Sequence, residues 1–457
     1  MRRFDWRWFV VSSMMIAAVM AGAATRPRYG GVLHVAMRAA PASLDPANVP
    51  YDGAQADSFA RRSLTTLMFD TLVTIDDNER IQPSLATAWQ IQPGSQRWQF
   101  RVRRGVKFHD GTPLTAETVA ASLRSANPSW NVVADADSVA IDSADVNLLA
   151  ELALPRNAIA KRTVDDNPSG TGPFHLVNWE PGKKLSLAAW EDCWRGRPFL
   201  DAIEIEMGKS FRDQMTALEL GKADLVEVAP ERTHRISQEG RRLASSSPIE
   251  LIALLFTRDV ASLDEKLLRE ALALSVERGS IRSVLLQGAG QATAGILPNR
   301  MNGYGFVFPT DADVPRARQE REQVRNRPVW TLGYDGSDPL ARLLAERIAL
   351  NAKDAGLLLQ PAPAGTTELR LARIPLSPDP WIALAGVANL AGLTAGKNRD
   401  GVEELYASEA ALLATRRVIP LFHLPVSYAS ASSLKNWMLR PDGSWDVADA
   451  RLSNAGQ

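Results

Sequence analysis

The sequence contains a single cysteine, Cys193, among 457 residues. One cysteine cannot form a disulfide within the chain, and it cannot supply an iron–sulfur cluster or a cysteine-based structural zinc site. The five histidines are scattered and include no pair at the H-x-x-x-H spacing typical of metal chelation. The sequence therefore indicates that the protein is not a metalloenzyme, and we predict no metal site and no cofactor.

The chain also lacks an excess of charge of either sign. Lys and Arg together number 52, and Asp and Glu together number 52, so the formal net charge is zero. A protein dedicated to nucleic acid carries a basic excess or a basic stripe, so we predict no nucleic-acid partner. With 45% hydrophobic and 23% charged residues, the composition is typical of a globular protein. It is not that of a disordered chain or of a protein with many membrane spans.

Long apolar runs are absent except at the N-terminus. Three arginines within the first seven residues precede an apolar stretch over residues 8–20, and small residues follow at 21–23. This order is typical of a secretory signal peptide, which we predict over residues 1–23. The apolar stretch is shorter than the ~20 residues that span a bilayer. An uncleaved N-terminal anchor is the alternative. We expect the rest of the chain in the periplasm or another extracytoplasmic space.

The remaining chain shows alternating strand and helix patterns. Large apolar residues alternate with polar ones over residues 98–102, as in a half-buried strand, and apolar residues at helical spacing predict a helix over 58–72. Asp264 is predicted to cap a later helix. Strand–helix–strand units recur from residue 170 onward, for example over residues 330–360. Repeated units of this kind predict α/β lobes with mixed sheets.

Several sequence motifs occur in a fixed order along the chain. The longest is WQFRVRRGVKFHDGTPLTAETV, at residues 98–119. The others are GGVL at 30–33, SLDP at 43–46, FDTLV at 69–73, PSLATAW at 83–89, GTGPF at 170–174, WRGRPFLD at 194–201, REAL at 269–272 and LP at 297–298. Together these motifs resemble the extracytoplasmic solute-binding proteins of the peptide/nickel ABC-transporter family, of the oligopeptide- and dipeptide-binding type.

The resemblance implies an α/β fold with two lobes, of the periplasmic-binding-protein type II-like kind, and an additional inserted α+β domain. Lobe 1 would be discontinuous, over residues 24–46, 168–250 and 427–457. The inserted domain would cover residues 47–167, and lobe 2 would cover residues 251–426. The ligand would lie between the lobes, which close around it by hinge motion.

The function that this resemblance implies is solute binding for an ABC importer, without covalent chemistry, so we predict that the protein is not an enzyme. It would capture a peptide-like or other small organic ligand and deliver it to membrane permease subunits, as a monomer. The alternative is a degenerate family member that no longer delivers substrate and acts as a ligand sensor or partner-docking protein.

Five residues are candidates for ligand contact by the same resemblance. Tyr51 and Arg61, around the start of the first long helix, match the family's cleft-facing segment, and Tyr334, Asp379 and Trp381 are the lobe-2 candidates. A guanidinium such as that of Arg61 can bind a ligand carboxylate through two hydrogen bonds. A solvated helix-surface arginine is the alternative for this residue.

The lobe-2 segment departs from the family pattern in one respect. Peptide-binding members carry an aspartate that pairs with the free α-amine of the peptide, and the matching position here is Leu376. A buried ammonium without a carboxylate is costly, which puts dipeptide binding in doubt. Asp379 is the candidate substitute, and an ordinary turn at Asp379-Pro380 is the alternative.

Two neighbouring side chains, His109 and Asp110, are the nearest approach to an acid–base pair in the sequence. Adjacent residues at the end of a strand point apart, and Asp110-Gly111 is a turn signal. We therefore predict a structural turn here. Cys193 has no neighbouring base in sequence and is predicted to be a packed thiol.

Overall fold

The structure, a computed structural model, describes residues 29–48, 58–78, 80–92, 96–143, 147–162, 167–304, 308–363, 367–394 and 401–453. The predicted signal peptide and the candidate ligand residue Tyr51 lie outside these ranges. Among the described residues, no helix combines the length and the apolar character that a membrane span requires.

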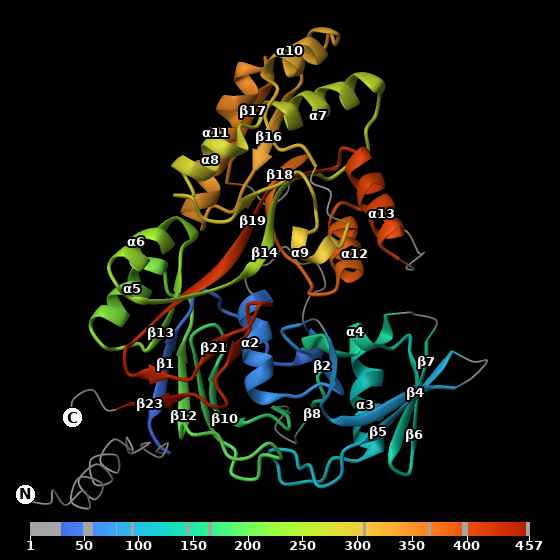
Figure 1. Ribbon diagram of the computed structural model, residues 1–457, viewed down its shortest axis with the longest axis vertical. Coiled ribbons are helices and arrows are strands. Elements are labelled where there is room, and N and C mark those ends of the chain that lie inside the picture. Colours follow the sequence, from blue (N-terminus) through green and yellow to red (C-terminus); the bar gives the residue numbers. More distant parts are fainter. Residues whose placement is uncertain are drawn as a thin grey trace, which may run out of the picture.

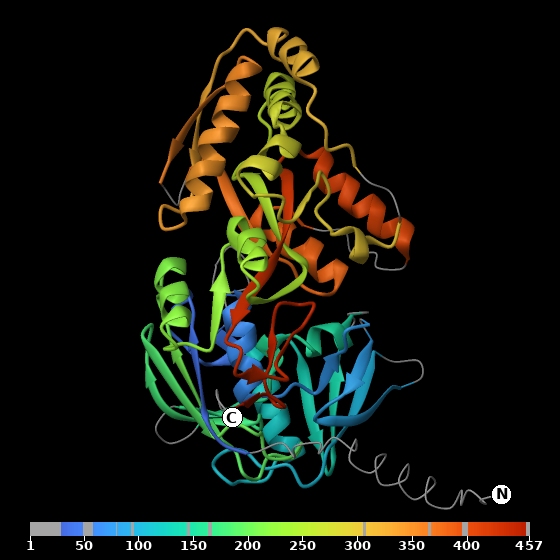
Figure 2. The same ribbon diagram turned by 60° about the vertical axis from the view of Figure 1, so that its left-hand side comes forward.

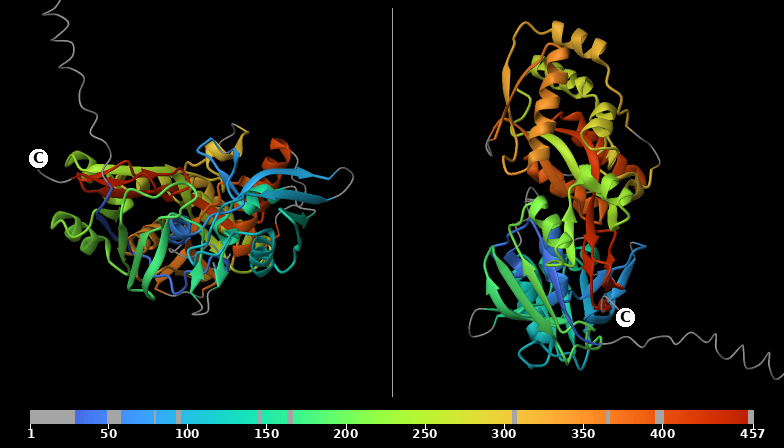
Figure 3. Two further views of the ribbon diagram at one scale, coloured as in Figure 1. Left: turned by 90° about the horizontal axis from the view of Figure 1, so that it is seen from below. Right: turned by 90° about the vertical axis from the view of Figure 1, so that its left-hand side faces the viewer.

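The described chain forms an elongated molecule of two stacked bodies, with a third body beside the lower one (Figure 1). Figure 2 and the right-hand view of Figure 3 show the same division between the upper and lower halves. We use the name lobe 1 for the main lower body, inserted domain for its neighbour and lobe 2 for the upper body. The exact residue boundaries between them remain predictions.

A mixed eleven-stranded sheet connects the two lobes. Its order is β10-β11-β12-β1-β13-β19-β14-β18-β16-β17, with β15 paired to β19. Strand β1 pairs in parallel with β12 and β13, and β16 pairs in parallel with β17 and β18. The strands are β1 (Val32–Ala36), β10 (Phe174–Glu180), β11 (Lys184–Ala189), β12 (Ala202–Glu206), β13 (Leu225–Val228), β14 (Arg242–Phe256), β15 (Gln291–Ala292), β16 (Val329–Gly333), β17 (Leu358–Ala362), β18 (Leu369–Pro375) and β19 (Val418–Ser430).

Two long antiparallel strands, β14 and β19, cross from lobe 1 into lobe 2 (Figure 1). The lobe-2 half of β14, residues 249–256, is an almost continuous apolar run and is buried throughout. Such a run is typical of a strand that is covered on both faces. The register with β19 shifts around Pro248 and Glu250, where the pair passes between the lobes. A register shift bends the strand pair locally, so the lobes meet at a break in the ladder.

Lobe 1 is completed by the C-terminal segment, which returns to it and packs against α2. The backbone N–H of Trp445 donates to Ser63 Oγ at 3.3 Å, and the returning segment lies beside lobe 1 in Figure 2. The remaining lobe-1 elements are α2 (Ser58–Met68), α5 (Phe211–Glu219), η3 (Pro230–Arg232), α6 (Thr233–Gln238), β20 (Leu434–Lys435), β21 (Met438–Leu439), β22 (Trp445–Asp446) and β23 (Arg451–Leu452).

The inserted domain has its own sheet and core. The sheet order is β4-β5-β7-β6, and α3 packs on it. Thr115 caps α3 through a hydrogen bond from Thr118 N. The elements between lobe 1 and the return to it are η1 (Pro46–Asn48), β2 (Val73–Ile75), β3 (Ile81–Pro83), β4 (Ala86–Ile91), β5 (Arg97–Val102), α3 (Ala116–Ala126), β6 (Asn131–Asp135), β7 (Ser138–Asp142), α4 (Leu148–Leu152), η2 (Pro155–Asn157), β8 (Lys161–Arg162) and β9 (Pro168–Ser169).

Lobe 2 surrounds its part of the sheet with helices, and buried apolar side chains form cores on both faces. Its helices are α7 (Leu263–Ser275), α8 (Arg278–Val284), α9 (Asn299–Asn302), α10 (Val314–Glu322), α11 (Pro339–Asp354), α12 (Pro380–Leu390) and α13 (Val402–Ala414). The alternation of strands and helices confirms the predicted α/β class. The predicted cap of α7 was wrong, because Ser262 rather than Asp264 accepts the hydrogen bond from Glu265 N.

Candidate functional site

The carboxyl ends of parallel strands from the two lobes face each other at the lobe junction. In open α/β sheets, ligands bind in the crevice outside such strand ends. Arg38 follows β1 in lobe 1, and Asp338 follows β16 in lobe 2. Their side chains approach across the junction, with 4.0 Å between Arg38 Nη1 and Asp338 Oδ2. This contact locates the candidate ligand crevice between the lobes.

A buried ion cluster forms the lobe-2 side of this junction. Arg373 on β18 binds Glu250 through Nε at 3.0 Å and through Nη2 at 2.6 Å. Its Nη1 binds Asp338 Oδ2 at 2.6 Å. Asp338 also caps α11, because its Oδ1 accepts the Leu340 N–H at 3.0 Å. We call these three residues, Glu250, Asp338 and Arg373, the lobe-2 ion cluster.

Two members of the lobe-2 ion cluster, Asp338 and Arg373, favour their charged forms despite their burial. Burial disfavours the charged form of Asp338, but the charge and hydrogen bond of Arg373, together with Arg38, hold the pKa of this carboxyl below its ordinary value. Burial likewise opposes the charge on Arg373, yet Glu250 and Asp338 raise the pKa of its guanidinium. Two carboxylates and one guanidinium give the cluster a net charge of −1.

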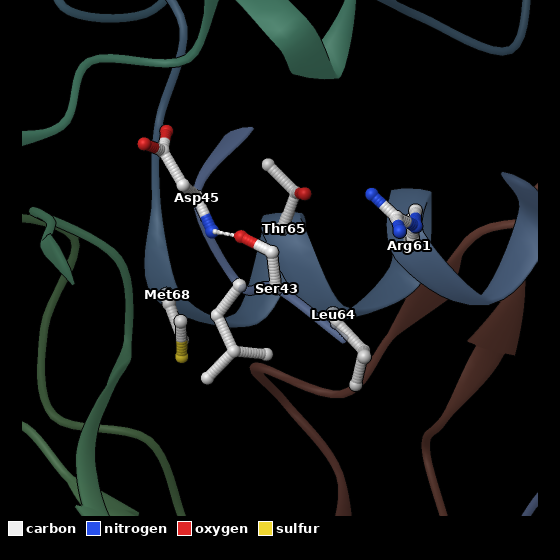
Figure 4. A pocket seen from close by; sticks show the side chains of 7 residues that line it. Ser43, Asp45, Arg61, Leu64, Thr65 and Met68 are labelled. Carbon is white, nitrogen blue, oxygen red and sulfur yellow. Dashed lines mark hydrogen bonds between the residues drawn. The ribbon is translucent and has the colours of Figure 1, made fainter. Parts of the chain in front are cut away.

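Arg61 lies half-buried on α2, at the edge of a small pocket of about 10 Å³. Ser43, Asp45 and Thr65 share the lining of this pocket, and Ser43 Oγ accepts the Asp45 N–H at 3.2 Å (Figure 4). The structure thus places Arg61 among polar side chains of lobe 1. Its contact with a ligand remains a prediction.

Asp379 is held by two hydrogen bonds that the sequence did not reveal. Its Oδ1 accepts the Ile382 N–H at 2.9 Å and caps α12. The same atom lies 3.5 Å from Nδ2 of Asn147, which precedes α4 in the inserted domain. Asp379 therefore joins lobe 2 to the inserted domain. An additional role in binding a ligand amine remains a prediction.

The other lobe-2 candidates pack against apolar side chains. Trp381 is 9% exposed and belongs to the core beneath α12, together with Leu376, which is 1% exposed. Tyr334 is half-buried against the other lobe-2 core, and its N–H donates to Ala362 O at 3.1 Å. Tyr334 and Trp381 therefore pack in different cores, and their contact with a ligand remains a prediction.

The predicted turn at His109 and Asp110 joins the inserted domain to lobe 1. Nε2 of His109 lies 3.0 Å from Gly172 O, and its Nδ1 accepts the Gly170 N–H at 3.3 Å. Burial lowers the pKa of His109 to about 4, so the imidazole is neutral. Asp110 instead binds Lys161 at 2.7 Å. The two side chains therefore have separate structural partners, and Cys193 is buried, as predicted.

Sequence reasoning missed a second interlobe pocket of about 40 Å³. It lies among the β2–β3 turn, the start of α12, α9 and the C-terminal segment. Its lining residues are Ile75, Asp76, Asp77, Arg300, Pro378, Arg440, Pro441 and Asp442. Sequence spacing gives no signal for this site, because its charged residues come from three distant segments.

Comparison with known proteins assigns the family. The model of the bacterial extracellular solute-binding proteins, family 5 Middle, matches residues 80–371, which is more than half of the chain. The chain belongs to this family. Its members are solute-binding proteins, so the prediction that the chain is not an enzyme is confirmed.

Curated family-5 relatives are distant. The nickel-binding protein NikA of Staphylococcus aureus is 26% identical over 310 residues, covering 63% of each chain. The oligopeptide-binding protein AppA of Bacillus subtilis is 21% identical over 302 residues, covering 58% of this chain and 54% of that protein. The matches thus span between about half and two thirds of the length of these relatives.

Solved family-5 structures share the fold over nearly the whole chain. NikA of Staphylococcus aureus in complex with Ni(L-His)2 superposes with a TM-score of 0.80 at 17% identity, covering 92% of this chain and 100% of that chain. AppA of Bacillus subtilis in complex with a nonapeptide superposes with a TM-score of 0.79 at 16% identity. This match covers 94% of this chain and 100% of that chain. These likenesses confirm the predicted fold.

The segment that leads to α9 and Arg300 is fixed by a buried carboxyl group. Glu409 on α13 is 0% exposed, and its Oε1 accepts the N–H groups of Ile296 and Leu297. Its Oε2 accepts the hydroxyl of Tyr304. Burial raises the pKa of Glu409 to about 7, although the two backbone hydrogen bonds oppose this shift.

We expect Glu409 to make the stability of this family-5 protein pH-dependent. Because its folded pKa lies above the unfolded value of about 4.3, its contribution is largest below pH 4 and is lost as the pH rises through 7. Between pH 5 and pH 8 the parent should lose about 2–3 kcal/mol of unfolding free energy relative to Glu409→Gln. Urea unfolding at both pH values measures this difference. The exposed Glu403→Gln is the control, and identical pH profiles for Glu409→Gln and the parent would contradict the expectation.

Proposed function

We propose that this protein is the extracytoplasmic solute-binding component of an ABC importer. It captures a small organic ligand between its lobes and delivers it to a membrane permease. The observation that carries the proposal is the two-lobed arrangement, in which strand ends of the two lobes meet at a junction crossed by β14 and β19. Hinge motion at the register shift around Pro248 lets the lobes close on a ligand. The N-terminal signal pattern and the family's extracellular character support secretion.

The ligand that we propose bears a carboxylate. The solved relatives hold Ni(L-His)2, a nonapeptide and, for MoaA of Agrobacterium tumefaciens R10, mannopinic acid. Histidine, a peptide C-terminus and an opine acid all present a carboxylate. Arg61 in lobe 1 supplies a guanidinium that matches this group. Asp379 is occupied as a helix cap and as an acceptor for Asn147, which weakens the case for recognition of a free amine.

A ligand panel tests this proposal by thermal unfolding of residues 24–457. The panel contains di- to pentapeptides, Ni²⁺ with L-histidine, and opine acids. A ligand that binds only the folded protein stabilises it by about 2.7 kcal/mol at a hundredfold excess over Kd. A clear upward shift in Tm with one class supports the proposal and identifies that class. If Tm does not change with any ligand class, the result contradicts the proposal. It then favours the alternative, a sensor or docking protein without transport.

For the ligand that the panel identifies, Arg61→Ala should weaken binding by about 10- to 100-fold. This range corresponds to the loss of a hydrogen-bonded charge pair. Calorimetric titration measures the Kd. The matched control is Arg235→Ala on α6, whose side chain is 77% exposed and should leave the affinity unchanged. Unaltered affinity in Arg61→Ala would remove this residue from the site.

A further inference from the structure

The lobe-2 ion cluster has one charge that it does not balance internally. Glu250 and Asp338 each carry a negative charge, and Arg373 carries a single positive charge. All three nitrogens of the Arg373 guanidinium are engaged with these carboxylates. The side chains of Glu250 and Asp338 are only 7% and 3% exposed. A nearby cation would therefore stabilise the cluster, because the field of the excess charge is weakly screened there.

Among the described residues, a second arginine, Arg38, lies near Asp338, and it comes from lobe 1. Its backbone N–H donates to Glu227 Oε2 on β13 at 2.6 Å. Its guanidinium lies 5.0 Å from the centroid of the Phe211 ring at the start of α5. These two contacts anchor Arg38 in lobe 1, while its guanidinium points across the junction to Asp338 at 4.0 Å. The side chain is 25% exposed.

We propose that Arg38 is a positioning residue that draws the two lobes together by pairing with the lobe-2 ion cluster. Separation of the lobes removes Arg38 from Asp338 and leaves the cluster with its excess negative charge. Closure restores the balance. The pair therefore raises the closed population of the protein before any ligand binds, and a preclosed crevice binds its ligand with a smaller conformational cost.

The position of the ion cluster relative to the crossing strands supports this role. Glu250 lies on β14 at the register shift with β19, and Arg373 on β18 joins it to the start of α11. The hydrogen bonds of Asp338 to Arg373 and to Leu340 N lie within lobe 2 and do not involve Arg38. The cluster can therefore persist while the lobes open, as a reversible interlobe contact requires.

The interlobe distance in the absence of ligand tests the proposal. Donor and acceptor dyes are placed at Glu117→Cys in the inserted domain and Leu263→Cys in lobe 2, in a Cys193→Ser background. The native side chain of Glu117 is 71% exposed, and Leu263 is 80% exposed. Single-molecule energy transfer then gives the ratio of closed to open molecules. The variants are Arg38→Met, Asp338→Asn, their combination, and Arg38→Lys.

Arg38→Met removes the charge but keeps an apolar stem against Phe211, and Asp338→Asn keeps a good helix cap. We expect each to lower the closed-to-open ratio by about two- to fivefold, as for a partly exposed ion pair. The closed-to-open ratio of the double variant should be no lower than that of Arg38→Met. Arg38→Lys should retain most of the parent ratio. High salt should reduce the parent ratio and leave the Arg38→Met ratio unchanged.

Two results would overturn the proposal. One is an unchanged ratio in Arg38→Met while the protein is folded by circular dichroism. The other is a double variant whose change in the closed-to-open ratio equals the combined changes of the two single variants, which would show that the residues act independently. The exposed Arg235→Met is the control for loss of one positive charge. The energy-transfer experiment contains no ligand. A negative result in it therefore does not contradict the proposed transport function, and a negative ligand panel does not contradict the proposed role of Arg38.

Discussion

Replacement of Arg373 by methionine is expected to lower the free energy of unfolding by about 3–5 kcal/mol. Removal of one member of a buried ion cluster leaves the remaining charges without compensation, and this is the usual size of the effect. Here two carboxylates, of Glu250 and Asp338, would lose their shared guanidinium. Methionine keeps the unbranched apolar stem but not the guanidinium, so the loss combines the uncompensated charge with the space that the guanidinium leaves.

Urea unfolding followed by tryptophan fluorescence measures the effect of Arg373→Met. The matched control is Arg342→Met on α11, whose side chain is 66% exposed and pairs with Glu346 one turn away. Such an exposed pair contributes about 0.3–0.5 kcal/mol. Addition of Glu250→Gln to Arg373→Met should recover part of the loss, because one buried charge is removed. Equal losses in Arg373→Met and Arg342→Met would rule out the buried cluster as a source of stability.

Asp70→Ala should have the second-largest effect, a loss of about 3 kcal/mol or more. Asp70 is 5% exposed and accepts hydrogen bonds from Thr171 Oγ1 at 2.8 Å, Trp194 Nε1 at 2.9 Å and Arg195 Nη2 at 2.7 Å. Its truncation leaves these donors without their acceptor. An unsatisfied buried donor costs about 1–3 kcal/mol, whereas the Arg195 side chain, which is 40% exposed, can bind water instead. Thr171 itself is 0% exposed, so water does not readily replace the carboxylate there.

The Asp70 prediction is checked by urea unfolding and by hydrogen exchange around Thr171 and Trp194. Protection should fall there first, because these residues join lobe 1 to the inserted domain through Asp70. Asp192→Ala is the control, since that carboxylate is 56% exposed and makes a surface pair with Lys107. A loss of less than about 1 kcal/mol in Asp70→Ala would contradict the prediction.

The structure explains why three motifs of the family occur together in this sequence. FDTLV, GTGPF and WRGRPFLD contribute Asp70, Thr171, Trp194 and Arg195 to the single cluster described above. In GTGPF, a Cβ added to Gly170 would lie 2.0 Å from Met68 O at the end of α2. A side chain has no room at this position, so glycine permits the close approach of the two segments. The three motifs thus form one set of contacts at the junction between lobe 1 and the inserted domain.

Local elements could be predicted from sequence because their signals are local. Alternation over residues 98–102 matches β5 (Arg97–Val102), and Thr115 caps α3 as its position before a helical pattern indicates. The helix predicted over 58–72 ends at Met68 instead. Beyond that residue the chain turns to bring Asp70 to Thr171, a tertiary contact that overrides the apolar spacing. The cap of α7 differs for a smaller reason, since Ser262 and Asp264 are both good capping residues.

Sequence alone determined the α/β class, the family and the absence of enzymatic chemistry, because motif order and composition are properties of the linear chain. Tertiary structure alone decided which charges meet. The contact between Arg38 and Asp338, the pairing of Arg373 with Glu250, and the bond from Asn147 to Asp379 each join residues far apart in sequence. Ionic contacts depend on distance and burial in the folded state. Spacing along the chain carries no information about either quantity.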